Sequence, residues 1–158
     1  MPIVINLRHL EDEDLDLQGE LPVAELDLDL RDELIRAEQP LRYDLQIQRL
    51  DESLLAQGSL RLQLDCQCVR CLKSFKYNLD LDHWTRHLEL AGEEKTPVVN
   101  DCVDLTPMVR EDILLEFPQH PLCEADCRGL SVGKASKTSD PTPQESSAWA
   151  ELDKLKLK

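Results

Sequence analysis

Two pairs of cysteines carry the clearest chemical signal in the sequence. Cys68 and Cys71 form a C-x-x-C motif, and Cys123 and Cys127 form a C-x-x-x-C motif. A tight turn can aim two thiolates at one ion, and Zn²⁺ takes four such soft ligands in its tetrahedral structural sites. The four cysteines are therefore candidate ligands of one structural zinc ion. Such an ion would contribute to folding and would leave no open position for a substrate.

The same cysteines have other interpretations. The second spacing is looser than that of a usual zinc knuckle, so the four side chains could instead be small buried hydrophobes or unligated thiols. His120, three residues before the second pair, could substitute as a ligand. Cys66 shares a face with neighbouring leucines and is expected in the core, whereas Cys102 has no partner nearby and is expected to be inert. Redox catalysis is disfavoured, because a C-x-x-C between strands lacks the helix N-terminus that lowers a thiol pKa.

The rest of the sequence lacks the patterns of an enzyme. Its five glycines are scattered and form no phosphate-binding loop. The carboxylates stand in alternating or clustered runs that are typical of a solvated face, and no nucleophile has an obvious general base. We therefore predict a non-catalytic protein without a small-molecule substrate.

The charge is strongly acidic and unevenly distributed. The 158 residues have a formal net charge of −14; residues 1–60 contain 15 acidic residues against five arginines, and residues 128–158 contain six basic residues against four acidic ones. An acidic surface repels phosphate and suits a basic partner, although it also serves solubility alone. No apolar run approaches the roughly 20 residues that span a bilayer, and the N-terminus does not resemble a signal peptide. A cytoplasmic location without membrane contact is expected.

The cysteine pairs need elements that hold them, and residues 1–90 predict an antiparallel β unit. Alternation of Ile3, Ile5 and Leu7 indicates a short strand, and strict alternation over residues 25–30 indicates a second strand with a carboxylate face. Apolar residues then alternate over 41–47 and again over 60–68. These two segments predict a hairpin that carries the first cysteine pair to its end.

Two irregularities are expected in these strands. Gly58 is a candidate β-bulge. The next strand places Phe75, Tyr77, Leu79 and Leu81 on one face, and its apolar positions change phase at Trp84, which predicts a bulge near His83.

The C-terminal half predicts one main helix. Thr106 is a suitable N-cap and Pro107 suits the first turn, while Val109, Ile113 and Phe117 fall on one face of a helix over about 106–117. A cysteine-containing segment, 121–130, follows. Residues 131–147 have the composition of a flexible linker, and 148–158 predict a short amphipathic helix with Trp149, Leu152 and Leu155 on its apolar side.

The predicted fold class is α+β: an antiparallel sheet or partly open β-barrel with one main helix and a short C-terminal helix. Residues 1–130 are expected to form a single domain.

The order of these motifs resembles the YceD (DUF177) family. The resemblance rests on Cys68–Leu72 with Phe75, the Asp-Leu-x-Pro-x-x-Arg-Glu run at 104–111, the cysteine segment ending in Arg-Gly-Leu at 128–130, and the aromatic-Ala-x-Leu-x-x-Leu-Lys run at 149–156. It extends from about residue 20 to the end. Many members carry a further Cys-Pro-x-Cys-Gly knuckle where this chain has residues 131–134. A site that used that knuckle would be absent here; the alternative is a site of the four remaining cysteines.

The resemblance implies a role in accumulation of large-subunit ribosomal RNA and in ribosome assembly. The partner would be a ribosomal protein or the pre-ribosomal large subunit, held by the acidic face. Arg70 and Glu111 match motif positions of the family, although they could equally form a structural ion pair. Trp149, Leu152 and Leu155 would form a docking helix. The alternative is a direct RNA-binding module that uses Arg70, Lys73, Lys76 and the basic tail, with Phe75 and Tyr77 stacking on bases.

Overall fold

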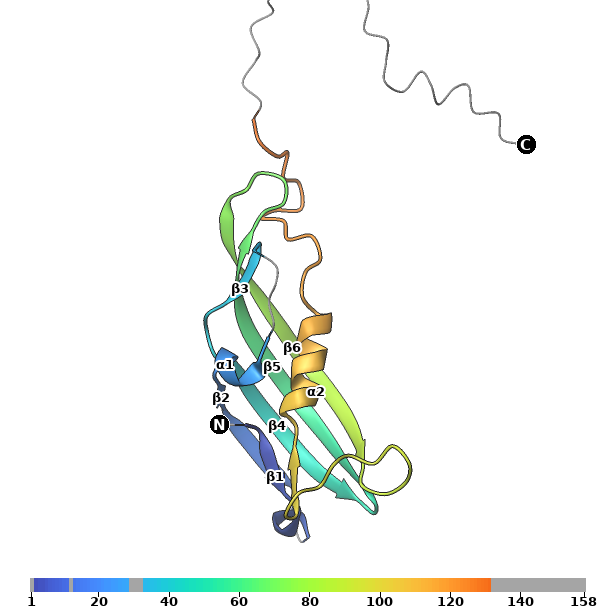
Figure 1. Cartoon of the computed structure of the whole chain (residues 1–158). Coiled ribbons are helices and arrows are strands. Elements are labelled where there is room, and N and C mark those ends of the chain that lie inside the picture. The colour runs from blue at the N-terminus through green and yellow to red at the C-terminus, as the bar shows by residue number, and fades with distance from the viewer. Residues whose placement is uncertain (1, 12, 29–32, 132–158) are drawn as a thin grey trace, which may run out of the picture.

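The computed structural model describes residues 2–11, 13–28 and 33–131, and a five-stranded antiparallel sheet forms its main layer (Figure 1). β2 pairs with β4, and β4 and β3 pair with successive parts of one edge of β5, while β6 pairs along its other edge. Their bounds are Leu15–Leu21 for β2, Ile35–Ala37 for β3, Leu41–Leu50 for β4, Ser53–Gln67 for β5 and Ser74–Glu89 for β6. The sheet curls into a half-barrel, and β4, β5 and β6 run along most of its length.

A second, smaller layer covers the inner face of the curled sheet. It contains the two-stranded sheet of β1 (Val4–Asn6) and β7 (Cys102–Asp104) and the helix α2 (Thr106–Leu115). A 3-10 turn (Leu7–Leu10) and the one-turn helix α1 (Val23–Leu26) complete it. Figure 1 shows α2 lying across β5 and β6. The architecture is α+β, as predicted, with the sheet as the larger part.

The hydrophobic core lies between these layers and follows from period-2 alternation. Successive side chains of a strand point to opposite faces, so every second residue of β4 and β5 enters the core. The sheet contributes the buried residues Leu41, Leu45, Ile47, Leu54, Leu60, Leu62 and Leu64, and the covering layer contributes Ile3, Ile5, Leu26, Val103, Leu105, Val109 and Ile113. Cys66 belongs to this core, which confirms its predicted place.

The predicted bulge near His83 is confirmed. Gly58 pairs with Trp84 and Leu60 pairs with Leu81, so β6 has one more residue than β5 between these two pairs. Asp82 and His83 together therefore oppose a single residue, Ser59. The extra residue shifts the inward positions from odd numbers, ending at Leu81, to even numbers, starting at Trp84. This is the phase change that the sequence displays.

The predicted strand over residues 25–30 is wrong where the structure describes it. The chain forms the helix α1 instead, with the N–H groups of Glu25 and Leu26 bonded to the carbonyl oxygen of Pro22. Asp27 then ends the turn in a left-handed conformation, with φ 45° and ψ 48°. Alternation alone does not distinguish a strand from one helical turn that buries a single leucine, Leu26. The next strand along the chain is β3, which pairs with residues 64–66 of β5.

A helix, α2, lies where the sequence predicts one, but both of its ends differ from the prediction. It stops at Leu115, two residues before the predicted end. Thr106 is not the N-cap: that position is Leu105, and the Thr106 hydroxyl accepts a hydrogen bond from the N–H of Ile3 at 2.9 Å. The Thr106 N–H donates to a carboxylate oxygen of Asp104. The threonine thus attaches the N-terminal segment to the helix.

The two ends of the chain also differ from the sequence-based expectations or lie outside the described residues. The first strand is shorter than predicted, because the chain turns into a 3-10 helix at Leu7. The predicted linker over 131–147 and the predicted helix over 148–158 lie outside the described residues, apart from Ser131. Within the described residues, no helix has the length and apolar character that crossing a membrane requires.

Candidate metal centre

The first cysteine pair lies in the turn that joins β5 to β6. Cys68 directly follows β5, and its N–H bonds to the carbonyl oxygen of Lys73 at 2.9 Å, which closes the hairpin. Within the turn, the N–H of Leu72 bonds to the carbonyl oxygen of Cys68, and Leu72 adopts a positive φ of 62°. The turn reverses the chain tightly enough to direct the Cys68 and Cys71 sulfurs to the same side.

The second pair is held against this turn by backbone contacts. The N–H of Val69 bonds to the carbonyl oxygen of Pro121 at 3.0 Å, and Arg70 donates from its guanidinium to the carbonyl oxygen of Cys127 at 2.9 Å. Gly129 has a φ of +83°, and a Cβ there would lie 3.4 Å from the carbonyl oxygen of Arg70. The segment after α2 therefore lies directly against the hairpin turn.

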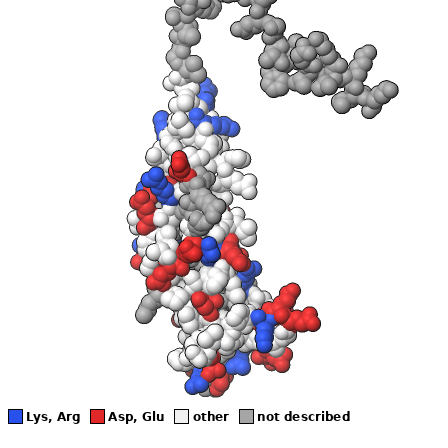
Figure 2. Space-filling model, in the orientation of Figure 1, with Lys and Arg blue, Asp and Glu red and all other residues white. Residues whose placement is uncertain are grey.

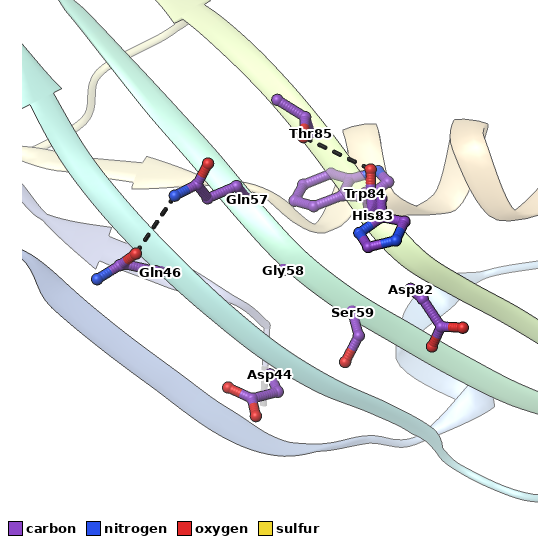
Figure 3. A pocket seen from close by; sticks show the side chains of 9 residues that line it. All are labelled: Asp44, Gln46, Gln57, Gly58, Ser59, Asp82, His83, Trp84 and Thr85. Carbon is purple, nitrogen blue, oxygen red and sulfur yellow. Dashed lines mark hydrogen bonds between the residues drawn. The ribbon is translucent and has the colours of Figure 1, made fainter.

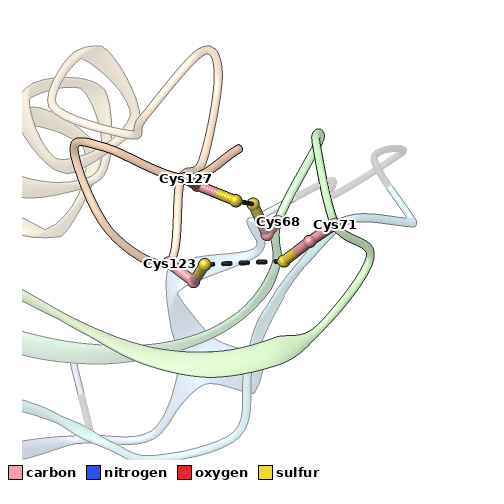
Figure 4. A group of neighbouring side chains, drawn as sticks. All are labelled: Cys68, Cys71, Cys123 and Cys127. Carbon is pink, nitrogen blue, oxygen red and sulfur yellow. Dashed lines mark hydrogen bonds between the residues drawn. The ribbon is translucent and has the colours of Figure 1, made fainter. Parts of the chain in front are cut away.

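The four sulfurs form one compact group (Figure 4). All four Sγ atoms lie within 4.8 Å of one another. The Sγ atoms of Cys68 and Cys127 are 3.8 Å apart, and those of Cys71 and Cys123 are 3.5 Å apart. These separations exceed the length of a disulfide bond, which is about 2.05 Å. Cys68 is buried, and the other three side chains are half-buried.

The pKa values of two thiols are shifted in opposite directions. The pKa of Cys68 falls from 9.0 to about 6, mainly because the backbone N–H of Cys123, and then that of Cys71, bonds to its thiolate. Burial opposes this shift. The pKa of Cys123 rises to about 12, mainly because of its side-chain hydrogen bond with Cys71, followed by burial. Without a cation the group thus releases one proton easily and holds another tightly.

The donor set fits a structural zinc ion. Four sulfurs at about 2.3 Å from a tetrahedral centre stand about 3.8 Å apart, and the two measured pairs are near this value. Backbone N–H groups that bond to the Cys68 thiolate would orient the ligand and moderate its charge. Four thiolates so close together need a cation, because their like charges repel. His120 is exposed and does not belong to the group of four.

The other predicted site residues lie apart from one another. Arg70 is exposed at the hairpin turn, whereas Glu111 is on α2, where its carboxylate lies 3.6 Å from the guanidinium of Arg86. Trp149, Leu152 and Leu155 lie outside the described residues. Phe75 and Tyr77 pack half-buried against the core, on the opposite face of β6 from Lys76.

Sequence reasoning missed two residues that position these elements. Pro121 is buried and supplies the carbonyl that binds Val69. Asp112 accepts a hydrogen bond at 2.7 Å from the indole N–H of Trp84, which joins α2 to β6. The indole N–H of a buried tryptophan requires a hydrogen-bond acceptor. The expected burial of Trp84 therefore indicated that an acceptor such as Asp112 lies beside it.

The outer face of the sheet is polar and carries a shallow hollow around the bulge (Figure 3). Its volume is about 430 Å³, and Gln46 and Gln57 form a hydrogen bond of 3.3 Å across it. Asp44, Ser59 and Asp82 also line it, without a convergent catalytic arrangement. Figure 2 shows carboxylates over the body and several Lys or Arg side chains near the end that holds the cysteines. At this end Arg70, Lys73 and Arg128 are exposed.

Comparisons with known proteins agree with the motif order. The family described as "Large ribosomal RNA subunit accumulation protein YceD" matches residues 56–156. Proteins of Mycobacterium tuberculosis and Mycobacterium bovis, both described as uncharacterized, are 28% identical over 124 residues, which is 71% of this chain and 60% of theirs. One from Mycobacterium leprae is 27% identical over 103 residues, 58% of this chain and 46% of its own length. The chain thus spans less than two thirds of these relatives. No solved structure matches it significantly.

Proposed function

The chain belongs to the YceD family, and on that premise we propose that it supports the accumulation of large-subunit ribosomal RNA without catalysing a reaction. The observation that carries this proposal is the family match over residues 56–156, which includes β6, α2 and all four clustered cysteines. The family's description supports a link to accumulation of large-subunit ribosomal RNA. A role in assembly of that subunit, in the cytoplasm, is the finer part of this proposal.

The mechanism that we propose is contact between acidic surfaces of the body and a basic ribosomal protein. The net charge of −14 disfavours direct contact with phosphate and favours a cationic partner. The exposed carboxylates of Asp16, Asp44 and Asp80 on the sheet have no ion-pair partner among the described residues. They are therefore available to lysine and arginine side chains of a partner.

In this proposal the cysteine group binds one zinc ion with a structural role. Cys68 and Cys71 would hold it from the hairpin turn, and Cys123 and Cys127 from the segment after α2. When bound, zinc would supply a cross-link between these two segments and would fix the basic end of the molecule. The chain's own residues hold the two segments together through the backbone hydrogen bond of Val69 with Pro121 and the hydrogen bond from the Arg70 guanidinium to the carbonyl oxygen of Cys127.

The test is a co-purification of the full chain from cells at moderate salt. We expect ribosomal proteins or precursor particles of the large subunit to be recovered, and we expect large-subunit RNA to fall relative to small-subunit RNA in cells that lack the protein. Recovery of neither class together with an unchanged RNA ratio would overturn the proposal. Partial charge screening at higher salt should weaken the interaction, because exposed ion pairs are screened within about 10 Å at 0.1 M salt.

A second candidate function is direct RNA binding by the cysteine-bearing end. The supporting observation is the exposure of Arg70, Lys73 and Arg128 around the hairpin turn. Two observations weaken it: Lys76 forms an ion pair with Asp65, and Phe75 and Tyr77 pack against the core, where they do not offer free faces to bases. RNA binding that falls steeply with salt would support this function, and no binding at low salt would exclude it.

A further inference from the structure

A groove lies between one edge of β6 and the helix α2. It has a volume of about 440 Å³ and is lined by the consecutive residues 80–86 of β6 and by Asp112, Leu115 and Glu116 of α2. Side chains of a strand alternate between its faces, so a groove lined by consecutive residues runs along the edge of the strand. The groove therefore exposes main chain of β6 as well as side chains.

Among residues 2–11, 13–28 and 33–131, no strand pairs with this edge of β6. β6 has 16 residues and pairs with β5 on its other side. In the part of the chain that the structure describes, no backbone hydrogen bond joins residues 74–88 to a segment other than β5. In Figure 1, β6 forms the right-hand border of the sheet, beside α2. An unpaired strand edge is a template for the main chain of another segment.

The walls of the groove combine apolar contact with negative charge. Leu115 is 81% exposed, which is unusual for a leucine on the helix that covers the core, and Leu81 is half-buried opposite the helix. Asp80, Asp82 and Glu116 are exposed carboxylates at the rim. Among the lining residues the cation is Arg86, which lies 3.4 Å from Asp112 and 3.6 Å from Glu111. Arg61 of β5, which does not line the groove, lies 3.5 Å from Asp82, so two cations stand against the four lining carboxylates. The groove is therefore net negative.

These features distinguish between possible occupants. A nucleic acid would bring its phosphates to three exposed carboxylates, which is unfavourable. A second copy of this chain, paired edge to edge, would bring the same carboxylates close to their own counterparts, and acidic residues at an edge oppose such self-pairing. An extended polypeptide with lysine or arginine side chains meets neither obstacle. Its apolar residues can contact Leu115, and its main chain can bond to the edge of β6.

We propose that this groove binds a short, extended, basic segment of a protein partner by strand addition to β6. The proposal rests on the proposed function, because it identifies where the basic partner would contact the acidic body. The bulge at Asp82–His83 interrupts the edge, so the added strand pairs without interruption on only one side of the bulge. The bound segment is therefore expected to be short.

The first test uses synthetic peptides of about ten residues, a length that suits strand addition. In one peptide lysine and valine alternate, in the second glutamate replaces lysine, and the third is the lysine peptide with alternate backbone nitrogens methylated. The protein is the full chain with Trp149→Phe, so that Trp84, which lines the groove, is the fluorescent reporter. We expect the lysine peptide to change the emission and to protect amides of residues 74–89 from hydrogen exchange.

The glutamate and methylated peptides separate charge from backbone pairing. We expect binding of each to be at least about tenfold weaker than that of the lysine peptide, because one lacks charge complementarity and the other lacks backbone donors. Equal binding of the methylated peptide, or protection of amides elsewhere but not in β6, would overturn strand addition. Failure of the lysine peptide to bind at low salt would overturn the whole inference.

The second test neutralises the rim without changing its shape. The variant Asp80→Asn, Asp82→Asn, Glu116→Gln should bind the lysine peptide roughly tenfold more weakly, because three exposed charges each contribute modestly. The control Glu13→Gln, Glu93→Gln, Glu94→Gln makes the same change in net charge at exposed positions outside the groove, and it should bind normally. Equal loss in both variants would show that net charge alone, and not the groove, attracts the peptide.

The same variants distinguish failure of this inference from failure of the proposed function. If the rim variant still recovers the ribosomal partner from cells as the unchanged chain does, the groove is not the contact and the proposed function stands. If neither protein recovers such a partner, the proposed function itself fails. Loss confined to the rim variant supports both.

Discussion

Gly58 permits β4 and β5 to approach more closely than other residues would allow. Its φ is +154°, and a Cβ built there would overlap the carbonyl oxygen of Asp44. We expect Gly58→Ala to lower the free energy of unfolding by about 2–4 kcal/mol, since both the backbone and the packing must adjust. Urea unfolding followed by circular dichroism would measure this loss.

Gly92 offers a matched control for the Gly58 prediction. It also has a positive φ, +105°, but a Cβ there would meet only a side-chain oxygen of Glu89 at 3.8 Å. Gly92→Ala should therefore cost about 1 kcal/mol from the backbone conformation alone. Equal losses in the two variants would contradict the argument that close approach of β4 explains Gly58.

The four clustered sulfurs predict a stoichiometric metal content. Protein purified without chelator should contain close to one zinc per chain, and Cys123→Ser should reduce this content strongly, because a structural site needs all four ligands. Cys102→Ser removes a half-buried cysteine outside the cluster and should retain the metal. Elemental analysis, with thiols counted before and after chelation, measures both. Equal zinc in all three proteins would exclude the cysteine site.

At the scale of elements, the polar contacts between α2 and β6 include a hydrogen bond that the apolar pattern of the helix does not reveal, beside the ion pairs of Arg86 with Asp112 and Glu111. The carboxylate of Asp112 is 20% exposed and accepts from Trp84 at 2.7 Å. Asp112→Ala leaves a buried indole N–H without its acceptor, which should cost about 1–3 kcal/mol of folding free energy.

The neighbouring acid on α2 serves as the control. Glu111 is 69% exposed, and its ion pair with Arg86 has an N–O distance of 3.6 Å. Glu111→Ala should change the free energy of unfolding by less than about 1 kcal/mol, as is usual for surface ion pairs. A similar loss from both substitutions, measured by thermal or urea unfolding, would mean that charge on the helix and not the Trp84 bond stabilises this contact.

Elements differ in how far the sequence determines them. The strands β4 and β5 and the bulge in β6 were predictable, because one buried face imposes alternation and an extra residue shifts its phase. The structure of residues 25–28 was not predictable from the sequence. A strand and one helical turn bury Leu26 equally well, and only the position of the chain relative to the sheet decides between them. β2, β3 and β7 were missed. The strands β3 and β7 have three residues each and carry too little alternation to recognise, and in β2 Gly19 interrupts the alternation of leucines within an acidic segment.

The candidate metal centre was predictable in composition but not in construction. The spacing of the cysteines indicated the ligand set, and the hairpin pattern indicated that Cys68 and Cys71 lie at its end. That residues 121–129 lie against this turn depends on backbone contacts such as Val69 with Pro121, between residues some fifty positions apart. A pattern of local periodicity contains no information about such contacts.

For the whole molecule, the cysteine group lies apart from the hydrophobic core. Cys68 is buried, yet neither it nor its three neighbours belongs to the core between the sheet and α2. Removal of the metal should therefore loosen the end of the molecule without unfolding the body. After chelation we expect faster amide exchange in residues 68–73 and 121–130 and little change in β4 and β5, because local opening reflects local contacts. Loss of protection throughout the sheet would contradict this separation.

The pairing of β1 with β7 determines when the protein can finish folding during its synthesis. Val4 lies opposite Asp104, and the N–H of Ile3 bonds to Thr106, which is 103 positions later in the chain. During synthesis, residues 3–6 must therefore wait until residues 102–106 have emerged from the ribosome, and until then Ile3 and Ile5 are exposed to solvent and to chaperones. Chains arrested before residue 102 has emerged should leave these residues open to a protease, and chains arrested well beyond residue 115 should protect them. A protein proposed to assist ribosomes would thus itself depend, during its own translation, on a contact that closes only after Thr106 has been added.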